Sequence, residues 1–111
     1  MNSYIEIINN EKVYVAVLNA GKCKAYSSFL KELVASFSLP ESASSNFNDI
    51  TGYICFPSWF DEYKTIKIIL SNSGSLKKNA NRFDEIITDL NILKNSWQSI
   101  SPQHKFIVEI L

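Results

Sequence analysis

Few side chains in this sequence could carry out chemistry, and they are scattered. The 111 residues include one histidine, His104, and two cysteines, Cys23 and Cys55. His104 lies beside a proline-containing turn with no Cys or acid nearby in sequence, whereas nucleophilic catalysis needs a nucleophile and a base within hydrogen-bonding reach. The cysteines do not form the closely spaced pairs that are typical of zinc sites. The sequence therefore predicts no catalytic residue, no metal site and no cofactor.

A serine-rich loop at 71–75 is the other candidate for chemistry. Its sequence, Ser-Asn-Ser-Gly-Ser, lies between an expected strand and an expected helix, where backbone N–H groups can bind a phosphate. Lys77 and Lys78 follow closely. The glycine spacing of nucleotide-binding loops is absent, so a capped turn is the favoured interpretation of this loop. A small enzyme that uses the loop is the least favoured of three functional hypotheses.

Charge is divided unevenly along the chain, although it sums to zero. Residues 40–63 contain acids but no Lys or Arg, and residues 64–82 contain bases but no acid. Carboxylates attract a cationic partner and aromatic side chains anchor interfaces, so the acidic segment is predicted to be a binding face. An ordinary solvated surface is the alternative, and it is favoured for the bases. The acids are Glu41, Asp49, Asp61 and Glu62, the aromatic residues are Phe47, Tyr53, Phe56, Trp59, Phe60 and Tyr63, and the bases are Lys64, Lys67, Lys77, Lys78 and Arg82.

Length and composition fit one domain over residues 1–111, because 111 residues with 46% apolar content can bury a single core. The chain starts without a cationic, apolar leader, and no stretch approaches the ~18 apolar residues of a membrane span. A soluble, cytoplasmic protein with no membrane contact is expected, with Cys23 and Cys55 as free thiols. Zero net charge removes general attraction to nucleic acid, so no nucleic-acid partner is expected.

The pattern of apolar residues predicts an α/β domain. Two β-type runs, 4–8 and 13–18, are joined by turn-forming residues at 9–12, which indicates a hairpin. The second run is apolar on both faces and is expected inside the sheet, covered on both sides. A cap at Ser27 or Ser28 is expected to start a helix that ends at Leu39-Pro40. The apolar stripe of this helix is Phe29, Leu30, Leu33, Val34 and Phe37.

Four further elements are expected along the rest of the chain. They are a short helix within 46–55, an Ile-rich strand at 65–70, a long helix at 81–97 and a terminal strand at 106–111. The resulting order, β-β-α-α-β-α-β, predicts right-handed crossovers and a small, mostly parallel sheet.

Three short motifs, together with the elements that follow them, carry a family resemblance. The motifs are Ser27-Ser28-Phe29-Leu30-Lys31-Glu32-Leu33, Leu39-Pro40-Glu41 and Asn46-Phe47-Asn48. In this order, residues 14–111 resemble the barstar family of intracellular inhibitors of the ribonuclease barnase. The resemblance implies a three-stranded parallel sheet flanked by helices, with strand 4–8 as an addition that forms the hairpin. It also implies that the loop and helix after Leu39-Pro40 enter a nuclease cleft, with a carboxylate in the place of substrate phosphate.

The departures from the family pattern fall on the inhibitory element itself. Asn48 and Gly52 stand where the family has two helix aspartates, and Ser42-Ala43 replaces an aromatic pair. Asp49 is one residue further on, which is about 100° around a helix, so it cannot simply substitute for the first aspartate. The segment 56–64 is also longer than in the family. These departures indicate a retained scaffold with a different target.

The favoured hypothesis is an immunity protein, or antitoxin, that occludes the basic active-site cleft of a cognate ribonuclease or other nuclease toxin used in bacterial competition. The chain is expected to be a monomer when free. The second hypothesis is a non-inhibitory protein-interaction module that kept the barstar-like fold. The expected contact residues, with aromatic side chains as anchors and carboxylates in the place of phosphates, are Asn46, Phe47, Asn48, Asp49, Gly52, Tyr53, Trp59, Phe60, Asp61 and Glu62.

Overall fold

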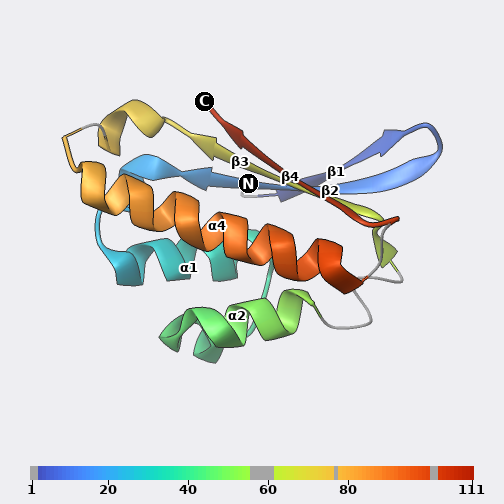
Figure 1. The fold of residues 1–111 in the computed structure, drawn as a ribbon, viewed down its shortest axis with the longest axis horizontal. Helices are drawn as coiled ribbons and strands as arrows, with labels where there is room; N and C mark the ends of the chain where they lie inside the picture. Colours follow the sequence, from blue (N-terminus) through green and yellow to red (C-terminus); the bar gives the residue numbers. More distant parts are fainter. Residues whose placement is uncertain (1–2, 56–61, 77, 101–102) are drawn as a thin grey trace.

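A four-stranded mixed sheet with helices on one face forms the fold, as seen in a computed structural model that describes residues 3–55, 62–76, 78–100 and 103–111 (Figure 1). The α/β class and the order of elements predicted from the sequence are confirmed. The strands are β1 (Ser3–Ile8), β2 (Glu11–Asn19), β3 (Thr65–Ser71) and β4 (Lys105–Ile110), and they lie side by side in this order. The α-helices are α1 (Tyr26–Ser36), α2 (Phe47–Ile54) and α4 (Ala80–Ile100), and the short 3-10 helices are η1 (Ala20–Lys22), η2 (Glu41–Ser45) and η3 (Ser73–Leu76).

The hairpin predicted at the start of the chain is confirmed, with a tighter turn than expected. β1 and β2 are antiparallel, and Ile8 pairs with Glu11 across the two-residue turn Asn9-Asn10. Both turn residues have positive φ, 52° and 66°, which is the backbone of a type I′ turn and a conformation that Asn tolerates. The twist of this turn matches the twist of the two strands, so pairing continues up to the turn itself.

The helices share one face because the parallel strands follow one another in chain order. β2, β3 and β4 are parallel, with Val15 opposite Lys67 and Lys67 opposite Ile107. Successive crossovers of the same hand, moving in the same direction, place their helices on the same face. Figure 1 shows α1, α2 and α4 on one side of the sheet. Val13 and Val15 on the other face are nevertheless buried, although α1, α2 and α4 all lie on the opposite side of the sheet.

The core lies between the sheet and the three helices. Alternate residues of β3 (Ile66, Ile68 and Leu70) face it and are fully buried. Tyr14 of β2 ties the sheet to the end of α1, because its hydroxyl donates a 2.6 Å hydrogen bond to the Ser36 carbonyl. The largest buried side chains from the helices and β4 are Phe29, Leu33, Phe37, Ile50, Ile54, Trp97 and Phe106.

The start of α1 differs from the sequence-based prediction. Ser27 and Ser28 lie inside the first turn and do not cap the helix, which begins at Tyr26 after the N-cap residue Ala25. The Tyr26 hydroxyl donates a 2.7 Å hydrogen bond to the Asp89 carboxylate on α4. This contact with a residue 63 positions away fixes the first turn of α1, so the local capping rule was overridden. Within the described residues, no helix is both long and apolar enough to cross a membrane.

Candidate binding site

An open groove of about 740 Å³ lies between η2 and the exposed side of α2. We call it the η2–α2 groove. Four of the residues predicted as partner contacts line it together, which are Asn48, Asp49, Gly52 and Tyr53. The remaining lining residues come from η2 and were not predicted as contacts, and they are Ser42, Ala43 and Ser45.

The short turn of η2 forms one wall of the groove. Ala43 is buried, and its N–H donates to the Pro40 carbonyl at 2.9 Å. The Ser45 hydroxyl donates to the Ser42 carbonyl at 3.1 Å, so this side chain satisfies a backbone group of its own turn. η2 packs against α1, which holds the wall on the folded core. The sequence showed only that 41–45 is polar, and no local signal identified it as a wall of a groove.

Asn46 fixes the start of α2 and orients Asp49. Its side-chain oxygen accepts a 2.8 Å hydrogen bond from the Asp49 N–H, which makes Asn46 the N-cap of the helix. The Asn46 amide then donates to the Asp49 carboxylate at 3.2 Å. A carboxylate in the first turn also interacts favourably with the helix dipole. Asn46 therefore acts as a structural residue of the site, and it holds the Asp49 carboxylate in place.

The two sides of α2 have different roles. Ile50 and Ile54 are fully buried and Phe47 packs partly buried against the core, as the spacing in the sequence predicted. Phe47, predicted as a partner contact, thus has a packing role. On the opposite side, Tyr53 is 41% exposed, and Asn48, Asp49 and Gly52 are exposed as well. A Cβ built at Gly52 would meet nothing within 4 Å, so the groove has space there.

The other predicted contacts on segment 56–62 are described only in part. Trp59, Phe60 and Asp61 lie outside the described residues. Glu62 is described and forms an exposed 3.2 Å ion pair with Lys12 of β2. Two of the described acids of segment 40–63 therefore have different surroundings, since Asp49 lines the groove and Glu62 pairs with the hairpin.

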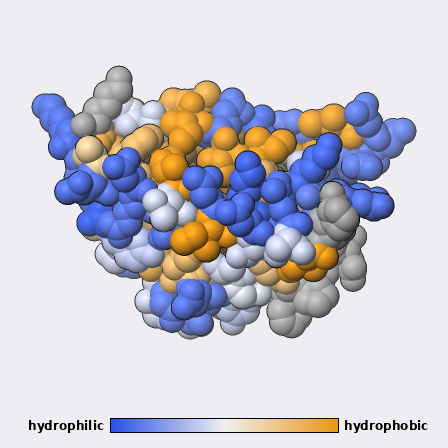
Figure 2. Space-filling view, viewed as in Figure 1, coloured by the Kyte–Doolittle hydropathy of each residue, from blue (hydrophilic) through white to orange (hydrophobic). Residues whose placement is uncertain are grey.

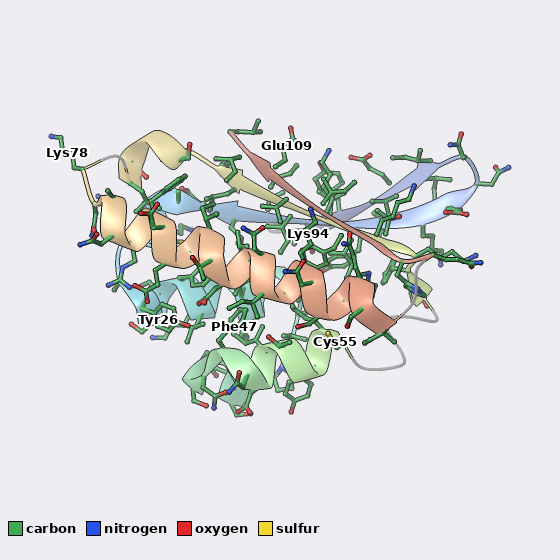
Figure 3. All side chains as sticks on the ribbon, viewed as in Figure 1. Tyr26, Phe47, Cys55, Lys78, Lys94 and Glu109 are labelled. Atoms are coloured by element: carbon green, nitrogen blue, oxygen red, sulfur yellow. The ribbon has the colours of Figure 1, made fainter. Side chains whose placement is uncertain are left out.

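No Lys or Arg is among the residues that line the η2–α2 groove, and the described bases lie elsewhere. Lys67 pairs with Glu109 on the open face of the sheet at 2.9 Å, and this hydrogen bond raises the pKa of Lys67. Arg82 pairs with Glu85 one turn along α4. Lys78 is exposed beside the start of α4, at the far end of the view from the hairpin (Figure 3).

The thiols are poorly suited to nucleophilic chemistry. Cys23 is fully buried, and burial, together with the charge of Glu32, raises the pKa of its thiol from 9.0 to about 12. Burial also raises the pKa of Cys55. A thiol with a raised pKa stays protonated at neutral pH, where the thiolate is the reactive form. Neither cysteine is in a disulfide, in agreement with the sequence-based expectation.

His104 and the serine-rich loop both have structural partners. The His104 ring lies edge-on to the buried indole of Trp97, with ring centroids 5.6 Å apart. Ser73–Leu76 forms η3, and the Ser75 hydroxyl donates a 2.9 Å hydrogen bond to the Asn72 carbonyl within the same turn. Among the described residues, no group of three or more His, Cys, Asp or Glu side chains could hold a metal ion.

Known proteins give no assignment for this arrangement. Comparison with protein-family models, with curated proteins and with solved structures found no match to the chain.

Proposed function

We propose that this chain is an immunity protein that binds a cognate nuclease toxin through the η2–α2 groove and blocks its active site. The observation that carries the proposal is the composition of the groove. It presents one oriented carboxylate and one exposed tyrosine, and none of the described residues that line it is a Lys or an Arg. Both side chains lie on the exposed side of α2, and an acidic, aromatic surface of this kind suits a partner with a basic site, such as the cleft in which a nuclease holds phosphates.

Inhibition would follow from occupation of that cleft. The Asp49 carboxylate takes the place of a substrate phosphate, and the Tyr53 ring serves as the anchor that excludes water around it. Asp49 is already oriented by the Asn46 amide, so less side-chain freedom is lost when the complex forms. The toxin remains chemically intact, and its substrate is kept out by the bound inhibitor.

The resemblance to barstar supports the same surface. Asn48 and Gly52, which stand in place of the two helix aspartates of that family, both line the groove. The barstar-like scaffold is part of the proposal, and the neutral residues at these positions favour a target other than barnase itself. A non-inhibitory interaction module is the second candidate, because one carboxylate gives a weaker attraction to a basic cleft than the family's acidic pair.

The test starts with identification of a partner by pull-down from the native cell and mass spectrometry, followed by titration calorimetry and a nuclease assay. Tyr53→Ala removes the anchor without touching the core or the N-cap. If Tyr53 is a hot spot worth about 2 kcal/mol, affinity falls roughly thirtyfold. Ile92→Ala is the matched control, because Ile92 is similarly exposed, at 47%, but lies on helix α4.

Charge reversal provides the second arm of the test. Asp49→Lys should weaken the complex and slow association, because attraction to a basic cleft becomes repulsion. Asp84→Lys makes the same change near the start of α4, away from the groove, and should change little. Undiminished binding by folded Tyr53→Ala and Asp49→Lys proteins would show that the interface lies elsewhere. A bound partner that retains full nuclease activity would favour the interaction module.

A further inference from the structure

The β1 edge of the sheet carries an unusual concentration of exposed apolar side chains. Four of its six residues are large, apolar and exposed, namely Tyr4 (46%), Ile5 (50%), Ile7 (63%) and Ile8 (50%). By the sheet register, Ile5 shares a face with Tyr14 on the helix side, whereas Tyr4 shares the opposite face with Val15. Apolar surface is visible over this hairpin in the space-filling view (Figure 2). A strand added beside β1 would contact apolar side chains on both of these faces.

The backbone of β1 is available for such a partner. Within the part of the chain that the structure describes, β1 pairs only with β2, and the two-residue turn makes Ile8 and Glu11 a hydrogen-bonded pair. Hydrogen-bonded and non-hydrogen-bonded pairs alternate in an antiparallel ladder, so the N–H and C=O groups of Ser3, Ile5 and Ile7 point away from β2. These groups form the row of donors and acceptors that another strand would pair with.

The two edges of the sheet differ in their protection. On β4, the Gln98 side chain accepts a 3.0 Å hydrogen bond from the Phe106 N–H, and Lys105 and Glu109 place charges along the strand. β1 has no Lys, Arg or Pro, and Glu6 is its one charged residue. Proteins commonly guard edge strands with charges, proline or covering side chains to prevent pairing with other chains. Among the described residues, β1 therefore lacks the covering side chain and the two charges that protect the β4 edge.

We propose that two copies of this chain pair through their β1 strands, antiparallel, with Ile5 opposite Ile5 of the second copy. In this register, three residues of one copy pair with the second copy through their outward-facing backbone groups. Ile5 pairs with Ile5, Ser3 pairs with Ile7, and Ile7 pairs with Ser3, and each pair exchanges two hydrogen bonds. It also places Tyr4 opposite Glu6 of the second copy. A register with Glu6 opposite Glu6 would oppose like charges, and one with Tyr4 opposite Tyr4 would pair fewer residues of β1.

The proposed dimer is compatible with the positions of the helices. Ile5 and Ile7 lie on the helix side of the sheet yet remain exposed, so the helices of one copy do not extend beneath its β1. The twofold axis of an antiparallel strand pair is perpendicular to the sheet, which keeps the helices of both copies on the same face of one eight-stranded sheet. This inference departs from the sequence-based expectation of a free monomer and does not depend on the proposed function.

The test measures mass by light scattering and sedimentation across a dilution series. The unmodified protein should approach twice its chain mass of 12.6 kDa and dissociate on dilution. Ile5→Lys and Ile5→Glu, each alone, should remain monomeric because like charges then face one another at the centre of the interface. An equimolar mixture of the two variants should restore the dimer. Ile92→Lys, a charge at an exposed isoleucine of α4, is the control and should dimerise normally.

Amide hydrogen exchange gives a readout at each position. The Ile5 and Ile7 amides should exchange slowly in concentrated samples and rapidly after dilution, whereas the Glu6 and Ile8 amides, which pair with β2, should be slow in both. A protein still monomeric at ~1 mM lacks a stable interface, and the proposal is then wrong. A dimer that survives Ile5→Lys must use another surface. A mixture that stays monomeric excludes the register centred on Ile5.

Discussion

Asn46→Ala and Asn48→Ala are the same chemical change two residues apart, and we expect them to shift stability in opposite directions. Asn46 is the N-cap of α2, and its side chain forms hydrogen bonds with both the N–H and the carboxylate of Asp49. Asn48 is exposed on the groove side of the same helix. Alanine removes the cap at the first position, whereas at the second it replaces a weaker helix former with a better one.

The expected changes in the free energy of unfolding follow from these two effects. Loss of an Asn cap costs about 1 kcal/mol, within a range of roughly 0.5–2. Alanine in place of Asn inside a helix contributes up to about 0.5 kcal/mol in favour of folding. Because Ile50 and Ile54 anchor α2 in the core, fraying of this eight-residue helix is coupled to the whole fold. We therefore expect the two variants to differ by about 1.5 kcal/mol, or roughly 6–12 °C in Tm for a domain of this size.

The difference can be measured by urea unfolding of the two variants and the unmodified chain, followed by circular dichroism. The midpoint should move down for Asn46→Ala and stay level or rise for Asn48→Ala, with unchanged m-values. Equal effects of the two substitutions, or a more stable Asn46→Ala protein, would refute the capping role of Asn46 and the positioning of Asp49 that depends on it.

Four further outcomes can be measured on the isolated chain. Gly52→Ala should stabilise the protein by about 0.5–1 kcal/mol in urea unfolding, because the added Cβ meets nothing and Gly is a poor helix former; a loss of stability would contradict the open space there. Tyr14→Phe should cost about 1–2 kcal/mol, since the buried Ser36 carbonyl loses its 2.6 Å donor, and a neutral effect would argue against that bond. The pKa of Cys23 is raised in the folded state, so its contribution to stability is complete below pH 9 and is lost as the pH rises toward 12. Unfolding free energy should therefore fall more steeply over this range in the unmodified chain than in Cys23→Ala, and parallel curves would show that the thiol titrates normally. Reductant should leave Tm unchanged, because Cys23 and Cys55 are not in a disulfide.

Patterns with a local cause were predictable from the sequence. The apolar spacing of Phe29, Leu33 and Phe37 marked the buried side of α1, and Ile50 with Ile54 marked that of α2. Each pattern repeats with the period of its own element, so no knowledge of the rest of the fold was needed. The exposed residues of α2 that line the groove were predicted as contacts on other grounds, namely the acidic and aromatic composition of the segment and the family resemblance.

Features that depend on contacts distant in sequence were not predictable. The start of α1 is set by the bond from Tyr26 to Asp89, and Glu62 is paired with Lys12, 50 residues away. The charge count along the chain put Glu62 together with Asp49, but position in sequence does not determine position on a surface. The guard of Gln98 on the β4 edge likewise involves a helix and a strand whose relative placement only the tertiary structure gives.

The separation of the two sides of α2 has a consequence for how such a protein can evolve. Phe47, Ile50 and Ile54 hold the helix in the core, whereas Asn48 and Tyr53 face solvent. Substitutions on the solvent side change neither the buried volume nor the N-cap, so selection can act on them almost independently of folding. The solvent-facing side of α2 can therefore change its chemistry over many substitutions while the buried side continues to hold the helix on the core.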